Sequence, residues 1–280
     1  MQQITVIEPT KSLFRFNWRE LWEFRSLIWL FAKRDLLIVY KQTILGPLWF
    51  VIQPVLMSFV FATVFGRLMK NVSTDGLPHI IFFLSGFVLW NYFKAVTENT
   101  ALSLGANSHI FSKVWFPRLV LPVATVITNF THFLFGLLVF FLFYFAKLYE
   151  GHAMAPTIWL AALPLLMLYV SLLGLGVGMW FAAAAVKYRD LGLALPIVMQ
   201  MWMFASPVIY TLSGVVDPVF RALLLCNPMA PAIEMFRLAL TGAGIFKADV
   251  VISGSLITLF LFITGLAAFN RAQRNFVDVV

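Results

Sequence analysis

Residues 158–185 read IWLAALPLLMLYVSLLGLGVGMWFAAAA, a stretch without a single charged side chain. A bilayer has a hydrocarbon core about 30 Å thick, which a helix of about 20 apolar residues can cross. Because lipid offers the backbone no hydrogen-bond partner, such a stretch must satisfy its own N–H and C=O groups as a helix. The stretch therefore predicts a membrane-spanning helix that follows a loop at Pro156.

The rest of the chain has the same character. Of its 280 residues 61% are hydrophobic and only 11% are charged, too few to cover a water-soluble globule of this size. Six intervals free of charge predict six transmembrane helices, within residues 42–66, 76–93, 119–146, 151–186, 191–216 and 250–270. We therefore expect an all-α integral membrane protein, with a six-helix transmembrane domain over residues 42–280.

The basic residues predict how the chain is oriented. With the N-terminus inside, most of the 20 Lys and Arg residues fall on segments at the inner face. The positive-inside rule then places both termini in the cytoplasm. The net charge of +8 is typical of such a membrane protein, so we expect membrane lipids and no nucleic acid as partners.

Residues 1–41 precede the first predicted span and contain an amphipathic pattern. Asn17 and Glu20 resemble a capping box, and apolar side chains then recur at helical spacing: Trp18, Leu21, Trp22, Trp29, Ala32, Leu36, Val39 and Tyr40. Basic side chains lie among them. A basic helix rich in tryptophan is typical of the membrane interface. We expect an interfacial helix in this cytoplasmic segment, either a simple anchor or a functional gate.

The region between the fifth and sixth predicted spans is apolar but interrupted by proline and charged residues: Asp217, Pro218, Arg221, Asn227, Pro228, Pro231, Glu234 and Arg237. This pattern predicts short re-entrant helices that dip back from the outer face, where protein must shield the backbone. Glu234 and Arg237 can pair on one helical face. The alternative is a folded outer cap without a role in transport.

Several chemistries are missing from the sequence. It has no Gly-x-x-x-x-Gly-Lys loop, so any ATP and magnesium would be bound by a partner. The four histidines lack a metal-ligand spacing, and the loops lack a catalytic cluster, so we expect no metal, no cofactor and no enzymatic activity in this chain. His132 is expected to hydrogen-bond to a neighbouring helix.

Charged side chains inside the predicted spans are rare. Lys94 and Glu98 can pair and are expected toward the inner end of the second helix. A carrier driven by a coupled ion usually has ionisable groups near the bilayer midplane. Their scarcity argues against such a carrier.

Small and aromatic residues mark the spans themselves. Gly174, Gly176 and Gly178, followed by alanines, predict a face for close helix packing. Aromatic side chains can stack on sugar rings, so we name channel candidates, although packing or lipid contact is their usual role. These candidates are Trp49, Phe61, Trp90, Tyr92, Trp202, Phe204 and Tyr210.

Four stretches together carry a family resemblance. They are Lys33 to Trp49 (KRDLLIVYKQTILGPLW) with Gln53-Pro54, Lys113 to Arg118 (KVWFPR) with Leu121-Pro122, Tyr188 to Leu191 (YRDL) with Ser206 to Tyr210 (SPVIY), and Asn227-Pro228 with Glu234 to Arg237 (EMFR). In this order they resemble the permease subunits of ABC exporters for bacterial polysaccharides, such as O-antigen, capsule and teichoic acid.

The resemblance implies a homodimer of permeases joined to two cytoplasmic ATPase subunits, which moves a lipid-linked glycan across the bacterial inner membrane. It implies that the amphipathic helix lies where the substrate enters, with Lys33, Arg34 and Lys41 as candidates for its head group. The candidates for ATPase docking are Lys113, Arg118, Lys187, Tyr188, Arg189 and Asp190. Asn227, Pro228, Glu234 and Arg237 would belong to the outer re-entrant region near the channel exit.

Two alternatives stay open. One is an ABC permease of the same fold that exports a drug or lipid. The other is a membrane-embedded enzyme or scaffold without an ATPase partner.

Overall fold

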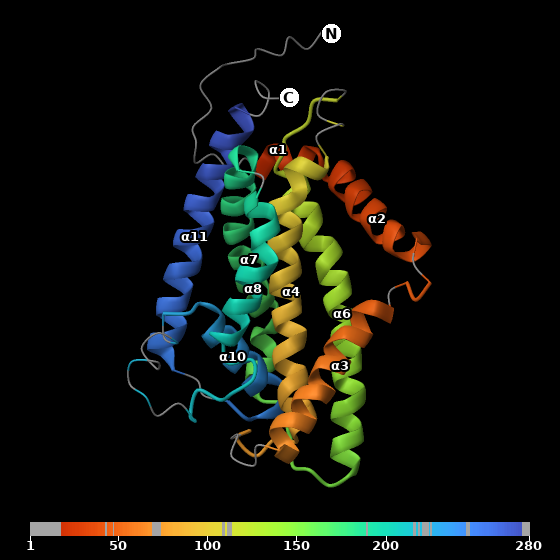
Figure 1. The fold of residues 1–280 in the computed structure, drawn as a ribbon, viewed down its shortest axis with the longest axis vertical. Coiled ribbons are helices and arrows are strands. Elements are labelled where there is room, and N and C mark those ends of the chain that lie inside the picture. Colours follow the sequence, from red (N-terminus) through yellow and green to blue (C-terminus); the bar gives the residue numbers. More distant parts are fainter. Residues whose placement is uncertain are drawn as a thin grey trace.

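The computed structural model describes residues 18–42, 44–46, 48–68, 74–107, 110, 114–188, 190–214, 217, 219, 224, 226–244 and 247–275. Within these residues the protein is helical and contains no strand. The elements, drawn in Figure 1, are α1 (Trp18–Glu23), α2 (Arg25–Gln42), α3 (Leu48–Thr63), the π-helix η1 (Val64–Leu68), α4 (His79–Ala106), α6 (Val120–Tyr149), the 3₁₀-helix η2 (Ile158–Ala162), α7 (Leu163–Lys187), α8 (Asp190–Phe204), α10 (Met229–Thr241) and α11 (Ala248–Asn275). The prediction of an all-α protein is confirmed for the part of the chain that is described.

Among the described residues, five helical segments are long and apolar enough to cross a membrane: Leu48–Gly66, His79–Ala106, Val120–Tyr149, Ile158–Lys187 and Ala248–Gln273. They correspond to five of the six predicted spans. The remaining prediction, residues 191–216, corresponds to α8, an apolar helix of 15 residues that ends at Phe204. Pro207 follows closely, and it lacks an N–H group and disfavours helical geometry at Ser206, so the helix does not continue.

α4 is longer than expected. Its span was predicted to end at Phe93 because Lys94 is charged, but the helix continues to Ala106. Lys94 Nζ lies 3.9 Å from Glu98 Oε1 one turn further on, so the two charges are accommodated within the helix. Lys94 therefore lies just past the middle of the 28-residue α4, and Glu98 lies one turn closer to its Ala106 end.

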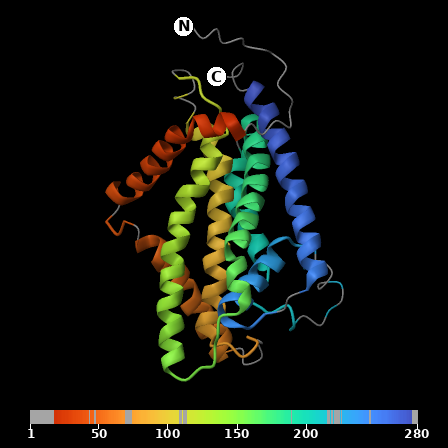
Figure 2. The same cartoon turned by 180° about the vertical axis from the view of Figure 1, so that it is seen from behind.

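α4 is the centre of the bundle. It packs against α3, α6, α7, α8 and α10, and its side chains Phe82, Phe83, Phe87 and Trp90 are almost fully buried. Figure 2 shows α6, α4 and α7 side by side along the bundle. By contrast, only 11% of the Leu48–Gly66 span is buried, so α3 lies on the outside of this chain.

The two ends of the bundle differ. α1 and the last turns of α11 lie at one end, which we call the α1 end (Figure 1), and a bond from Arg118 Nη1 to the Gln273 carbonyl (2.5 Å) joins the start of α6 to α11 there. α10 lies in the opposite half, beside α4 and α7, and this is the α10 end. The Thr157 N–H donates to the Ala239 carbonyl (3.0 Å) and fixes the start of η2 on α10.

The predicted small-residue face on α7 is confirmed. A Cβ on Gly176 would lie 2.7 Å from the Phe262 backbone nitrogen, and a Cβ on Gly178 would lie 2.7 Å from the Thr97 carbonyl oxygen. A Cβ on Gly265 of α11 would in turn overlap the Gly176 carbonyl oxygen. α7 can therefore approach α11 on one side and α4 on the other only because these positions lack a side chain.

Replacing Gly176 with leucine should separate α7 from α11. Overpacking of this kind costs about 1–3 kcal/mol, and more where backbone atoms are the obstacle. We expect a lower midpoint of thermal unfolding in detergent. The measurement is the loss of the folded peak in size-exclusion chromatography after heating to increasing temperatures. Gly105→Leu is the control, because no atom from another part of the described chain lies within 4 Å of a Cβ at Gly105. Equal midpoints for the two variants would contradict the packing argument.

Candidate functional site

α2 leaves the bundle at the α1 end and lies across the side of α6 (Figures 1 and 2). Its buried residues Ile28, Phe31 and Ala32 pack on an apolar cluster that includes Phe116 and Val120. A different set, Trp18, Trp22 and Trp29, is 73%, 71% and 60% exposed. The apolar stripe expected from the sequence is thus two surfaces, one that holds α1 and α2 on the protein and one that presents tryptophan outward.

The three cations predicted for the head group differ in their surroundings. Lys33 and Lys41 are exposed. Arg34 donates from Nε to Asp35 Oδ1 (2.9 Å) and from Nη1 to Asn107 Oδ1 (2.9 Å), which ties α2 to the end of α4. Two exposed ammonium groups are therefore available on α2, whereas Arg34 is already engaged by protein.

The aromatic channel candidates are not gathered on one surface. Trp90 and Tyr92 are 1% and 3% exposed, and the Tyr92 hydroxyl lies 2.6 Å from Ser171 Oγ. Phe61 stacks with Phe65 and packs on α4. Trp49 and Phe204 are exposed, and Trp202 and Tyr210 are partly buried. In this conformation the bundle thus encloses Trp90 and Tyr92, and a channel role for the set stays a prediction.

The side chain of Asn227 forms hydrogen bonds with the end of α8, with the residues that follow it and with the start of α10. Its Nδ2 donates to the Ala205 carbonyl (2.8 Å) and to Ser206 Oγ (2.8 Å). Its Oδ1 accepts from Trp202 Nε1 (3.0 Å) and from the Met229 N–H (3.0 Å). One side chain therefore joins the end of α8 to the start of α10.

Arg237 on α10 is the most deeply buried cation of the described residues, at 2% exposed. Its Nη2 donates to the Val208 carbonyl (2.8 Å), its Nε donates to Ser85 Oγ (3.3 Å), and its guanidinium carbon lies 3.8 Å from the centre of the Phe82 ring. The predicted pair with Glu234 is present, with Nη1 3.6 Å from Oε1. This cation thus fixes α10 and the segment after α8 on α4.

Of the ATPase-docking candidates, Lys113 and Arg189 lie outside the described residues. Lys187, Tyr188 and Asp190 are exposed at the α1 end, between α7 and α8. Arg118 bonds to the Gln273 carbonyl, and burial lowers the pKa of its guanidinium, as is typical of a cation held against protein. Trp115, which belongs to the KVWFPR stretch but was not singled out as a docking residue, is 73% exposed at the same end.

A row of polar side chains on α4 was also missed. Asn91, Lys94 and Glu98 recur at intervals of three and four residues and share a helical face with Asn99 at its edge, a spacing visible in the sequence. Asn99 Nδ2 donates to Asn129 Oδ1 of α6 (3.1 Å). We call these four residues of α4 its polar face.

His132 of α6 lies beside this polar face. It stacks on Phe50 with ring centres 3.5 Å apart and lines a cavity of about 50 Å³ with Asn91, Tyr92 and Asn129. Its ring nitrogens are buried and have no hydrogen-bond partner among the described residues. The expected hydrogen bond to a neighbouring helix is therefore absent.

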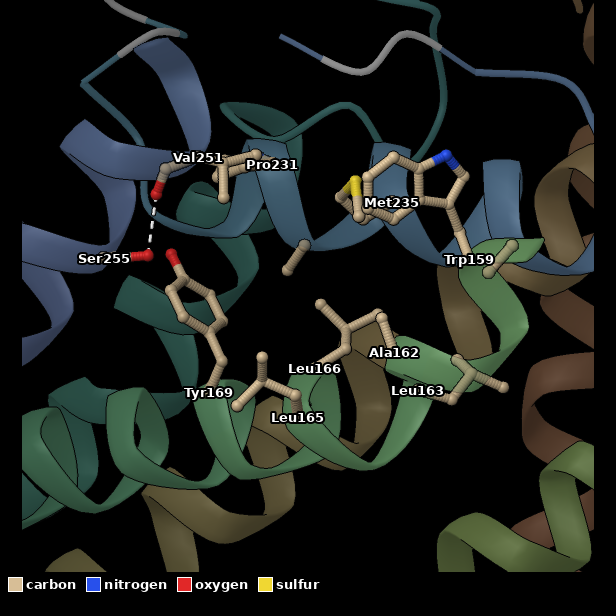
Figure 3. Close-up of a pocket in the computed structure, with 12 residues that line it drawn as sticks. Trp159, Ala162, Leu163, Leu165, Leu166, Tyr169, Pro231, Met235, Val251 and Ser255 are labelled. Carbon is tan, nitrogen blue, oxygen red and sulfur yellow. Dashed lines mark hydrogen bonds between the residues drawn. The ribbon is translucent and has the colours of Figure 1, made fainter. Parts of the chain in front are cut away.

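Figure 3 shows an apolar pocket of about 120 Å³ between η2, α7, α10 and α11. Trp159, Leu166 and Met235 line it, and the Tyr169 hydroxyl at its edge donates to the Pro228 carbonyl (2.5 Å). Because its lining is almost entirely apolar, the pocket suits a hydrocarbon segment better than a sugar.

Comparison with known proteins gives a family and relatives. The profile of a family described as ABC-2 type transporter matches residues 26–241, from α2 to the end of α10. The chain is 25% identical over 256 residues to the O-antigen export system permease protein RfbA of Klebsiella pneumoniae, which covers 91% of this chain and 95% of that protein.

Two further relatives are similar over most of their length. The O-antigen export system permease protein RfbA of Myxococcus xanthus is 25% identical over 264 residues, 94% of this chain and 98% of that protein. The polysialic acid transport protein KpsM of Escherichia coli is 23% identical over 231 residues, 82% of this chain and 87% of that protein.

Replacing Arg237 with methionine should destabilise the protein strongly. Breaking a buried ion pair by removing one partner costs about 3–5 kcal/mol, and here the Val208 carbonyl also loses its donor. We expect a large fall in the midpoint of thermal unfolding. Arg271→Met is the control, because Arg271 is exposed on α11; similar midpoints for both variants would show that Arg237 is not a structural cation.

Proposed function

The chain belongs to the ABC-2 type transporter family, and we propose that it is the permease subunit of an ATP-driven exporter that moves a lipid-linked polysaccharide across the bacterial inner membrane. The observation that carries the proposal is the nearly end-to-end match to O-antigen export permeases of two bacteria. A permease supplies the membrane path, and this sequence has no P-loop of its own. ATP and magnesium are therefore assigned to a partner ATPase, and the chain itself needs no cofactor.

We propose that α8 is the fifth of six transmembrane segments, because it is apolar and packs along α4 and α7. α10 and the segment before it form the re-entrant region at the outer face. The buried contacts of Arg237 and Asn227 support this, because a backbone that turns back within a membrane must be shielded by protein.

The proposed assembly contains two copies of this chain and two ATPase subunits. Apolar side chains of α3 and α8 are exposed, such as Leu56, Phe59 and Ile197, and this surface is compatible with contact to a second copy of the chain. The α1 end is assigned to the cytoplasm, together with both termini, because basic residues of α1, of the end of α7 and of the last turns of α11 lie there, among them Arg19, Lys187 and Arg271. The ATPase subunits then dock on the loops of this end.

The substrate is proposed to enter beside α2. The exposed tryptophans Trp18, Trp22 and Trp29 suit the interface, and Lys33 and Lys41 can hold the diphosphate of a polyprenyl-linked glycan by charge-assisted contacts. Arg34 is assigned to holding α2 on α4 rather than to the substrate. Exposed aromatics such as Trp49 and Phe204 are the better candidates for contact with the sugar chain.

The double variant Lys33→Gln/Lys41→Gln should export poorly at low substrate density. Each cation contributes about 1 kcal/mol of attraction to an anionic surface, so the density of lipid-linked glycan for half-maximal export should rise by about tenfold or more. The rate of export in inverted membrane vesicles is the measurement.

The control is Lys147→Gln, a half-buried lysine at the end of α6 that is paired with Glu150. It should export normally. If the α2 double variant and this control have the same half-maximal density, the head-group role of Lys33 and Lys41 is wrong.

Charge reversal at Asp190 should weaken ATPase docking. Asp190 and Asp249 are both exposed aspartates in the first turn of a helix, but they lie at opposite ends of the bundle. Both reversals lose a similar helix-dipole interaction of about 0.3–1 kcal/mol. Only Asp190→Lys should reduce co-purification of the ATPase and substrate-stimulated hydrolysis; equal co-purification with Asp249→Lys would count against docking at this loop.

A further inference from the structure

One face of α4 changes its chemistry along its length. Phe83, Phe87, Asn91, Lys94 and Glu98 follow one another at intervals of three or four residues, so they lie on one side of the helix. Toward the α10 end this side is aromatic, and from the middle of the helix toward the α1 end it is polar.

The change coincides with the place where α3 stops covering α4. Phe61 of α3 packs on Phe83 and Phe87, with ring centres 5.9 and 5.3 Å apart, and both α4 side chains are buried. The first turn of α3 reaches His132, where Phe50 stacks on the imidazole. Beyond this level Lys94 and Glu98 remain 27% and 23% exposed, and Asn99 is exposed. The face is therefore apolar where it is covered and polar where it is open.

An open polar face in the middle of a transmembrane helix is unfavourable against lipid. A charged side chain at the centre of a membrane helix costs about 2.5–3.5 kcal/mol, and such residues almost always face a bundle interior or a water-filled cavity. Both ring nitrogens of His132, and Glu98 Oε1, are buried without a hydrogen-bond partner among the described residues. The adjoining cavity of about 50 Å³ has room for a few water molecules, at about 10–15 Å³ each. These groups require water or a polar ligand.

We propose that the polar face of α4, together with Asn129 and His132 of α6, forms a hydrated row that binds the hydroxyl groups of the exported sugar chain. The inference rests on the proposed function. Lys94 and Glu98 cancel in charge, so the row favours neutral hydroxyl groups over a diphosphate. Amide side chains such as Asn91 can donate and accept at once, as vicinal hydroxyls require.

The row also continues from the proposed place of substrate entrance. Arg34 of α2 bonds to Asn107 at the end of α4, and Asn99, Glu98, Lys94 and Asn91 follow from there toward the middle of the helix. Exposed lysines on α2 thus suit the head group, and the neutral row suits the sugars that follow it.

Hydration is tested by thiol modification in inverted vesicles that hold the complete transporter. Cys226, the single cysteine, is replaced by serine, and one cysteine is introduced at Ala95, which adjoins the polar face. The matched control is Leu138→Cys on α6, where the leucine is 65% exposed and away from the cavity that Ala95 lines. A charged, membrane-impermeant methanethiosulfonate should modify position 95 at least about tenfold faster, because only the thiolate reacts and hydrocarbon suppresses it.

Equal rates, or no reaction at position 95, would overturn the hydrated row. Asn91→Cys supplies a second position, so that the outcome does not depend on the folding of one variant.

Binding is tested by protection of the same cysteine. The probe is the oligosaccharide released by mild acid from the lipid-linked glycan of the same cells, and it should slow modification at position 95 severalfold. Inorganic pyrophosphate at equal concentration should not slow it. Protection by pyrophosphate alone, or none by the oligosaccharide, would overturn sugar binding in this row. A transporter that hydrolyses ATP but exports no glycan would instead refute the proposed function, and the rates of modification would still decide whether the row is hydrated.

Discussion

A carbonyl group that leaves its helix inside an apolar surrounding must find a donor from the protein, because lipid supplies none. The segment after α8 creates this problem at Ala205 and Val208. Asn227 donates to the first carbonyl and Arg237 to the second, and each of these side chains also reaches another element. The position of α10 beside α4 and the path of the chain directly after α8 both depend on these bonds.

This arrangement buries the charge of Arg237, which is unfavourable, and three kinds of contact offset the loss of its hydration. Glu234 supplies an opposite charge, Ser85 and backbone carbonyls accept hydrogen bonds, and the Phe82 ring lies against the guanidinium. The planar guanidinium can serve several acceptors at fixed angles, which a lysine ammonium could not do from the same place.

At the α1 end, polar and charged side chains are exposed rather than buried. α1 and α2 are held on α6 by buried side chains such as Ile28 and Phe31, while their tryptophans and lysines are exposed. The polar face of α4 begins where α3 no longer covers this helix, and Lys94, Glu98 and Asn99 are partly or fully exposed there.

The sequence by itself determined that the protein lies in a membrane, that it is helical and where five of its spans lie. A charge-free stretch about 20 residues long satisfies its backbone in lipid by forming a helix. The sequence also indicated the close packing at Gly176 and the Glu234–Arg237 pair, since both follow from local spacing. Tertiary structure alone decided that Trp90 is buried while Trp49 is exposed. It also decided that Arg34 bonds to Asn107 while Lys33 is exposed, and that α4 continues past Lys94. These outcomes depend on where α3 ends and on which helix covers which face, and such contacts between distant segments leave no periodic signal within either segment.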